Sequence, residues 1–139
     1  NYRIYFGDTG LLIGSLDEEA HEDLRKNQNF NTYKGAVYEN VVADMLVKQG
    51  YNLYFYKSEK GTVEMDFFIR DINSLVPIEV KANDNRAVSL NNLIDSNKYK
   101  DIKYGIKLCN KNIGFNGKFY TFPYFMGFLL KRYMQQVKY

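Results

Sequence analysis

The sequence predicts an α/β protein in which helices flank a mixed sheet. A long helical pattern over 31–50 is followed by three strand-like runs, at 51–57, 63–70 and 75–81. The joins between these runs are short and polar, which favours an antiparallel meander. A second, shorter helical pattern then precedes a strand-like run at 103–108. Because a helical crossover between neighbouring strands implies parallel pairing, the sheet is expected to be mixed.

The segment before this core predicts short elements. Residues 3–6 have the composition of a short strand, and Asp8 or Thr9 can cap a short leucine-bearing helix after it. The acidic stretch 17–26 predicts a helix with a solvated charged face. A polar loop is expected over 27–32.

The best helix prediction follows this loop. Asn31 or Thr32 can cap its start, and Gly50 is typical of a residue just after a helix end. Glu39 lies near its beginning. The apolar residues that recur at helical spacing are Val37, Tyr38, Val41, Val42, Met45 and Leu46.

The last third of the chain alternates between helical and extended patterns. Ser89 is predicted to cap the second core helix, and 110–118 reads as a loop rich in Gly and Asn. An extended run at 119–122 precedes Pro123, which is expected to open a last helix that ends at Tyr133. This helix is apolar on nearly all sides, so we expect it in the core, with docking on a partner domain as the alternative.

Composition limits the class of protein. The 139 residues suit a single domain over 1–139, and 45% hydrophobic residues argue against disorder. A single Cys excludes an internal disulfide and suits a reducing compartment, so we expect a cytoplasmic protein. A single His excludes a site built from several histidines. No apolar stretch is long enough to span a membrane. The net charge of +3 permits binding to nucleic acid, and the absence of an initial Met suggests a piece of a longer protein.

Three charged residues on two adjacent strands are the strongest functional signal. Asp66 lies on one strand, and Glu79 and Lys81 lie two residues apart on the next. If the turn is centred within 72–73, Asp66 faces Glu79 and Glu64 faces Lys81, since opposed residues share one face. A shift of one pairing step would place Asp66 opposite Lys81 instead. In either register, Asp66, Glu79 and Lys81 are expected to converge on one side of the sheet.

These residue types suit phosphodiester hydrolysis. Two facing carboxylates repel each other unless a divalent cation lies between them, so Asp66 and Glu79 are candidate ligands for Mg²⁺ or Mn²⁺. Such a cation activates water and polarises phosphate. Lys81 could orient the attacking water or offset charge on the phosphate. Glu39 could hold a metal-bound water or a second ion. Glu64 is a spare carboxylate, interpreted as solvent-exposed or as a partner for Lys81.

The sequence resembles a known nuclease superfamily. The segments 35–42, 64–69 and 77–81 are similar to the PD-(D/E)XK nucleases. The segments 5–12 and 122–130 narrow the resemblance to the domain of unknown function found at the C-terminus of many prokaryotic AAA-type ATPases. The resemblance covers nearly the whole chain.

This resemblance implies a restriction-endonuclease-like core of order αβββαβ, with extra elements at both ends. The superfamily's metal-binding Asp corresponds to Asp66, its Glu to Glu79, its Lys to Lys81 and its helix Glu to Glu39. Met65 stands where the Pro that names the motif would be. The chain has no ATP-binding motif, so ATP would enter only through an upstream domain that the sequence does not include.

Three hypotheses follow. The first is a metal-dependent nuclease, either an endo- or an exodeoxyribonuclease, that acts on DNA together with an upstream ATPase domain. The second is a catalytically inactive module of the same fold that binds nucleic acid or regulates its ATPase. The third is an oligomerisation domain that forms a homo-oligomer through the C-terminal aromatic helix.

Other chemically suggestive residues have simpler interpretations. Asp8-Thr9-Gly10 matches the aspartic-protease tripeptide, but a single copy before a helical run favours a turn and a helix cap. His21 is expected on a solvated acidic face and Cys109 in the core. The basic residues that could contact phosphate, or be ordinary surface charges, are Lys57, Lys60, Arg86 and Lys98.

Overall fold

The core of the protein follows the predicted order of helix, three strands, helix and strand. The computed structural model describes residues 2–26, 28, 31–59, 63–72, 74–83 and 86–136. Its helices are α1 (Thr9–Gly14), α2 (Glu18–Lys26), α3 (Asn31–Lys48), α4 (Val88–Ile94) and α5 (Leu130–Gln136), with a 3-10 helix η1 (Tyr124–Leu129). Its strands are β1 (Tyr54–Lys57), β2 (Glu64–Arg70), β3 (Leu75–Val80), β4 (Gly105–Cys109), β5 (Gly114–Phe115) and β6 (Phe119–Pro123).

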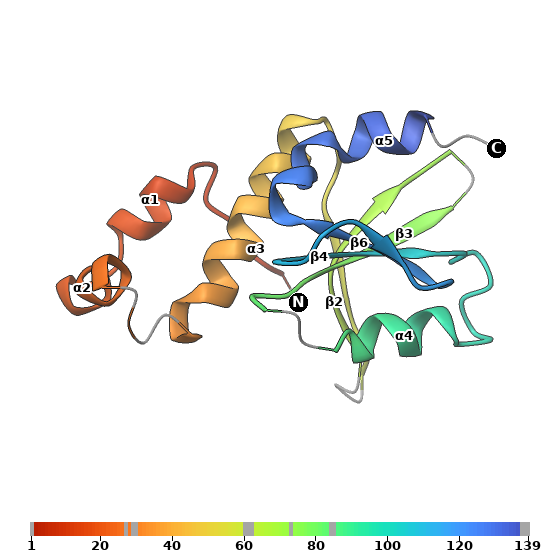
Figure 1. Ribbon diagram of the computed structural model, residues 1–139, viewed down its shortest axis with the longest axis horizontal. Helices are drawn as coiled ribbons and strands as arrows, with labels where there is room; N and C mark the ends of the chain where they lie inside the picture. Colours follow the sequence, from red (N-terminus) through yellow and green to blue (C-terminus); the bar gives the residue numbers. More distant parts are fainter. Residues whose placement is uncertain are drawn as a thin grey trace.

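The described strands form one mixed six-stranded sheet in the order β1-β2-β3-β4-β6-β5. The β1–β2 and β2–β3 pairs are antiparallel and the β3–β4 pair is parallel, as predicted. Helix α4 supplies the crossover between β3 and β4 and covers one face of the sheet, while α3 and α5 lie on the other (Figure 1). The mixed α/β fold class predicted from the sequence is therefore confirmed.

The register of the β2–β3 hairpin places the candidate site. Phe67 pairs with Ile78 and Arg70 pairs with Leu75, so the turn is centred between positions 72 and 73. One step beyond the last pair, Asp66 and Glu79 stand opposite each other, which is the first of the two registers considered from the sequence. Their strands separate there, because the paired ladder ends at Phe67.

Two apolar clusters cover the two faces of the sheet. The cluster on the α3 side contains Val42, Ala43, Leu46, Phe67, Ile69, Val76, Ile78, Val80, Ile106, Leu108, Phe122, Leu130 and Met134. The cluster on the α4 side contains Met65, Phe68, Ala87, Leu90, Leu93, Ile102 and Phe119. Met65 and Phe68 reach the same face although they are three residues apart, and the β1–β2 register shifts beside them. A bulge of this kind re-aims a side chain, here next to Asp66.

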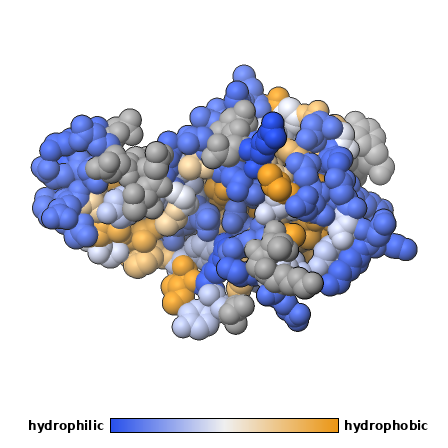
Figure 2. Space-filling model, turned by 90° about the horizontal axis from the view of Figure 1, so that it is seen from below, coloured by the Kyte–Doolittle hydropathy of each residue, from blue (hydrophilic) through white to orange (hydrophobic). Residues whose placement is uncertain are grey.

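The N-terminal part differs from the prediction in one respect. Residues 3–6 form no strand; they run irregularly toward α3. Asp8 caps α1 as expected, because its Oδ1 accepts from the backbone N–H groups of Gly10 and Leu11. Helices α1 and α2 extend away from the sheet (Figure 1), and Figure 2 shows apolar surface on this part of the molecule. Leu11 of α1 is 65% exposed there.

Three predictions about helix ends are refined or corrected. Gly50 has φ +82°, so it does take the left-handed conformation after α3. The caps proposed at Asn31 and Thr32 concern side chains outside the described part of the structure. Ser89 does not cap α4: it lies inside the helix, and Ala87 stands at the cap without a side-chain bond.

The C-terminal helix is not buried on all sides. After Pro123 the chain forms η1 and only then α5, so the first turns are 3-10 rather than α-helical. Leu130 is buried, but Phe125 and Phe128 are 62% and 53% exposed. The aromatic run after Pro123 therefore contributes to the core from one side of the helical segment only. None of the helices among the described residues combines the length and the apolar character needed to cross a membrane.

Candidate active site

Asp66 lies where the β2–β3 ladder ends. Its Oδ2 accepts a hydrogen bond of 2.8 Å from the backbone N–H of Val80. The Asp66 carboxylate thus binds a backbone N–H group of β3 that lies beyond the last paired residues of the β2–β3 hairpin. The Asp66 side chain is only 15% exposed, and this backbone hydrogen bond helps to fix its position.

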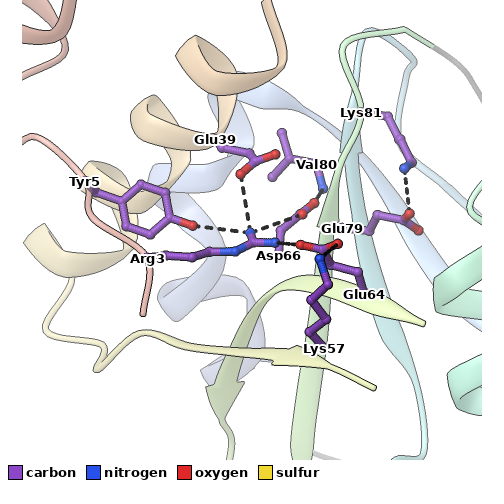
Figure 3. A network of polar contacts seen from close by, with 9 residues as sticks. All are labelled: Arg3, Tyr5, Glu39, Lys57, Glu64, Asp66, Glu79, Val80 and Lys81. Atoms are coloured by element: carbon purple, nitrogen blue, oxygen red, sulfur yellow. Dashed lines mark hydrogen bonds and ion pairs between the residues drawn. The ribbon is translucent and has the colours of Figure 1, made fainter. Parts of the chain in front are cut away.

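Three carboxylates share the guanidinium group of Arg3 (Figure 3). Arg3 Nη1 lies 3.4 Å from Glu39 Oε2 and 3.5 Å from Asp66 Oδ1. Arg3 Nη2 forms an ion pair with Glu64 Oε1. Lys57 Nζ approaches the other Glu64 oxygen at 3.3 Å. The structure therefore brings Glu39, Glu64 and Asp66 around one cation that belongs to the chain itself.

The segment that carries Arg3 is attached to α3 and to the core. The side chain of Asn40, which follows Glu39, is buried and accepts from the Phe6 N–H at 2.8 Å and donates to the Phe6 carbonyl at 3.1 Å. Tyr5 packs against Phe67 with ring centroids 5.4 Å apart. These contacts set the position of Arg3, and Glu39 and Asn40 together make the N-terminal half of α3 the wall of the site.

Glu79 and Lys81 form a second group. Lys81 Nζ lies 2.7 Å from Glu79 Oε1. Ile78 and Val80 belong to the cluster on the α3 side, so Glu79, which alternates with them, points toward α4. The backbone of Leu90 in α4 lowers the pKa of Glu79, which agrees with this direction. Asp66 and Glu79 are opposite each other in the strand register. Their side chains have different partners, because Asp66 pairs with Arg3 and Glu79 pairs with Lys81.

Glu79 is an unusually buried acid. Its side chain is 3% exposed, and its Oε2 has no hydrogen-bond partner. Its neighbour on β4 is Lys107, which is also buried and stands beside it in the parallel register. A buried carboxylate oxygen without a partner is costly, and such groups are concentrated at functional sites.

The backbone of Lys81 is held on two sides. Its N–H donates to the Leu108 carbonyl at 2.9 Å, so the strand direction of β3 continues past Val80. Its carbonyl accepts a hydrogen bond from the Tyr124 hydroxyl. Tyr124 in turn stacks on Tyr38 of α3, with ring centroids 4.2 Å apart. The start of η1 and helix α3 therefore both fix Lys81, which explains how a distant C-terminal element contributes to the site.

Burial raises the pKa of Glu39 and of Asp66. Burial and the nearby charge of Asp66 raise the pKa of Glu39 to about 7, although Arg3 and Lys81 oppose the rise. Burial likewise raises the pKa of Asp66, offset by the Val80 hydrogen bond and by the charges of Arg3 and Lys81. Glu39 therefore changes charge near neutral pH, which suits a group that accepts or donates a proton.

The other two acids differ in direction. Burial raises the pKa of Glu79, and the ion pair with Lys81 only partly offsets this effect. The hydrogen bond with Arg3 lowers the pKa of Glu64, against a smaller effect of burial. The charge of Lys81 lowers the pKa of both Glu39 and Asp66, and the charge of Asp66 raises that of Glu79. The two groups of residues are therefore separate in contacts but coupled in charge.

The carboxylate oxygens of the site are of the chemical type that a hard cation such as Mg²⁺ prefers. Carboxylate oxygens are its preferred protein ligands, and Glu79 Oε2 is an acceptor with no other partner. In the arrangement shown by the described residues, no three His, Cys, Asp or Glu side chains are close enough together to hold a metal ion. The Arg3 guanidinium lies between the carboxylates of Glu39, Glu64 and Asp66.

Two residues of the site were not anticipated from the sequence. Arg3 was taken as part of a strand, and Lys107 was not singled out. Arg3 is 61 residues away from Glu64, so no local spacing links them. For Lys107, an interruption of an apolar strand by one Lys was a usable signal. Glu64 was expected to pair with Lys81 or solvent; it pairs with Arg3 and Lys57 instead, and its side chain is 42% exposed.

The remaining candidates have structural roles. His21 is half-buried, not on a freely solvated face, and its Nε2 lies 2.7 Å from the Ile13 carbonyl. Cys109 is buried, as predicted. Lys98 lies over the Tyr99 ring and Arg86 is exposed. Lys60 lies outside the described residues.

A family model matches residues 34–125, which include most of α3, the three-stranded meander, α4 and β4. The model is described as a domain of unknown function, and the matched region contains Glu39, Asp66, Glu79 and Lys81 but not Arg3. Comparisons with curated proteins and with solved structures gave no match. Because the matched region is more than half of the sequence, the chain belongs to the family Domain of unknown function (DUF4143).

Proposed function

We propose that this chain is a nuclease-like domain of the PD-(D/E)XK type, which hydrolyses DNA phosphodiesters with Mg²⁺ or Mn²⁺ and works with an AAA-type ATPase encoded upstream. The observation that carries the proposal is the position of Asp66. It lies where the β2–β3 ladder ends, opposite Glu79, and Glu39 and Lys81 are coupled to it through their charges.

Each residue has a role that its surroundings support. Asp66 and Glu79 would supply carboxylate oxygens to the cation, which when bound lowers the pKa of a water and polarises the phosphate. The Lys81 ammonium, which is about one-third exposed, can approach a phosphate oxygen and offset its charge. Glu39 has a pKa of about 7, so its carboxylate can take up a proton at physiological pH.

The proposal is tested by cleavage assays on single-stranded and double-stranded DNA with Mg²⁺ or Mn²⁺. Asp66→Ala and Lys81→Ala should abolish cleavage while the fold is retained, as judged by circular dichroism. Matched controls are Asp44→Ala and Lys48→Ala, which remove a surface pair of the same residue types from α3. They should cleave like the wild type. Cleavage that persists in Asp66→Ala or in Lys81→Ala would refute the assignment.

A second candidate function is a catalytically inactive module that binds nucleic acid or regulates its ATPase. One observation favours it: the acids of the site are already neutralised by the chain's own cations, Arg3 and Lys81. This function predicts no metal-dependent cleavage by the wild type. It also predicts that Asp66→Asn leaves DNA binding unchanged in a fluorescence-anisotropy titration.

A further inference from the structure

Residues 2–6, called the strap below, bring a positive charge into the candidate site from outside the region that the family model matches. We propose that the strap is an autoinhibitory element: the Arg3 guanidinium pairs with Asp66, one of the two carboxylates proposed to hold the divalent cation, and with Glu39 and Glu64 beside it, and the cation binds when Arg3 withdraws. This inference rests on the proposed function, because it concerns the regulation of the same site.

The contacts of Arg3 are those of a cation held in a binding site rather than of a surface side chain. Its guanidinium faces three carboxylates that come from α3 and β2, and its side chain is only 20% exposed. The Tyr5 hydroxyl lies 3.5 Å from Nη1, and the Phe55 ring lies 5.3 Å below the guanidinium carbon. Figure 3 shows Arg3 between the three acids and the Tyr5 ring.

The guanidinium and a metal ion would compete for the same oxygens. Glu39 Oε2 and Asp66 Oδ1 both point at Arg3 Nη1, so neither oxygen is available to another cation while Arg3 is in place. The remaining Asp66 oxygen already accepts from Val80.

The strap is attached in a way that permits withdrawal. It has no helix or strand of its own, and Tyr2 and Ile4 are 84% and 78% exposed. Its attachments are the hydrogen bonds between Phe6 and Asn40 and the packing of Tyr5. Helix α1, which follows, contains no buried residue. Withdrawal of the strap therefore uncovers Phe67 and Asn40, but it breaks none of the strand pairs of the sheet that carries Asp66 and Glu79.

The test is calorimetric titration of the chain with Mn²⁺. Arg3→Ala should bind Mn²⁺ at least tenfold more tightly than the wild type, because the competing cation is gone. Asn40→Ala keeps Arg3 but removes the hydrogen bonds to Phe6, so it should also bind more tightly, by a smaller factor. The matched control is Lys57→Ala, which removes a positive charge from the edge of the same cluster without opening space between the acids. The loss of this neighbouring charge should tighten binding only about two- to threefold, because Lys57 pairs with Glu64 from the edge and does not lie between the acids.

The outcomes separate the strap from the proposed function. If Arg3→Ala is folded and binds Mn²⁺ no more tightly than Lys57→Ala, the strap is not inhibitory. If Arg3→Ala does not fold, Asn40→Ala decides in the same way. Wild-type binding that is lost in Asp66→Ala but is unchanged in the strap variants would refute the strap and leave the proposed function standing. Absence of Mn²⁺ binding in every protein, with and without DNA, would overturn both.

Discussion

Replacing Glu39 by Gln should make the protein more stable above neutral pH. In the folded protein, burial and Asp66 raise the pKa of Glu39 from 4.5 to about 7. The folded state then binds the Glu39 proton more tightly than the unfolded chain does, so the free energy of unfolding falls as the pH rises from 4.5 to about 7. Gln is neutral at every pH and does not lose this free energy.

The magnitude follows from the size of the shift. At about 1.36 kcal/mol for each pKa unit, the change from 4.5 to about 7 corresponds to at most about 3 kcal/mol. Because 31% of the Glu39 side chain is exposed, solvent screening reduces the expected effect to about 1–2 kcal/mol. Glu39→Gln should therefore exceed the wild type by about 1–2 kcal/mol at pH 8 and lose this advantage near pH 4.5.

The assay is urea unfolding of both proteins between pH 4.5 and pH 8. Glu64→Gln gives a control of opposite sign, since Arg3 lowers the pKa of Glu64. The stability that Glu64 contributes is present above its unfolded pKa and is lost as the pH falls, so Glu64→Gln should be less stable than the wild type at pH 7. If the Glu39→Gln and wild-type curves run parallel across this interval, the reasoning about the buried Glu39 carboxylate is wrong.

Three further predictions concern the framework around the site. Asp8→Ala should cost about 1 kcal/mol through the lost α1 cap, measured by urea unfolding; an unchanged midpoint would contradict the cap. Gly105→Ala should cost about 1–3 kcal/mol, because the added Cβ would lie 2.6 Å from Leu90 Cδ1 in the tightly packed β4–α4 contact. Thermal unfolding tests it, and a variant as stable as the wild type would show that α4 moves aside freely. Gly50→Ala should cost about 1 kcal/mol because φ is +82° there, and an unchanged melting temperature would mean that the turn relaxes.

Local patterns were sufficient to predict the parts of the fold that depend on neighbours in sequence. The hydrophobic period of α3 predicts the helix. The short polar turn within 71–74 predicts the β2–β3 hairpin but left two registers open, and the structure has the one centred between positions 72 and 73. In that register Asp66 stands opposite Glu79, whereas the other register would have placed Asp66 opposite Lys81. The parallel β3–β4 pair followed from the length of the α4 connection.

The arrangement within the site depends on contacts that sequence spacing does not encode. Arg3 and Glu64 are 61 positions apart in the sequence. The segment that carries Arg3 is held by the side-chain amide of Asn40 in α3. The bulge beside Asp66 separates its direction from that of Glu79, which strict alternation could not show. Likewise, the aromatic run after Pro123 has one buried side because η1 packs against α3 and leaves Phe125 and Phe128 outside.

The most direct test of the site is a Mn²⁺ titration by calorimetry of four proteins: the wild type, Asp66→Ala, Arg3→Ala and the double variant with both changes. The account predicts saturable binding to Arg3→Ala that disappears when Asp66 is also replaced. Binding that persists without Asp66 would place the cation elsewhere. No binding to any of the four proteins, with DNA present or absent, would contradict a metal site at Asp66.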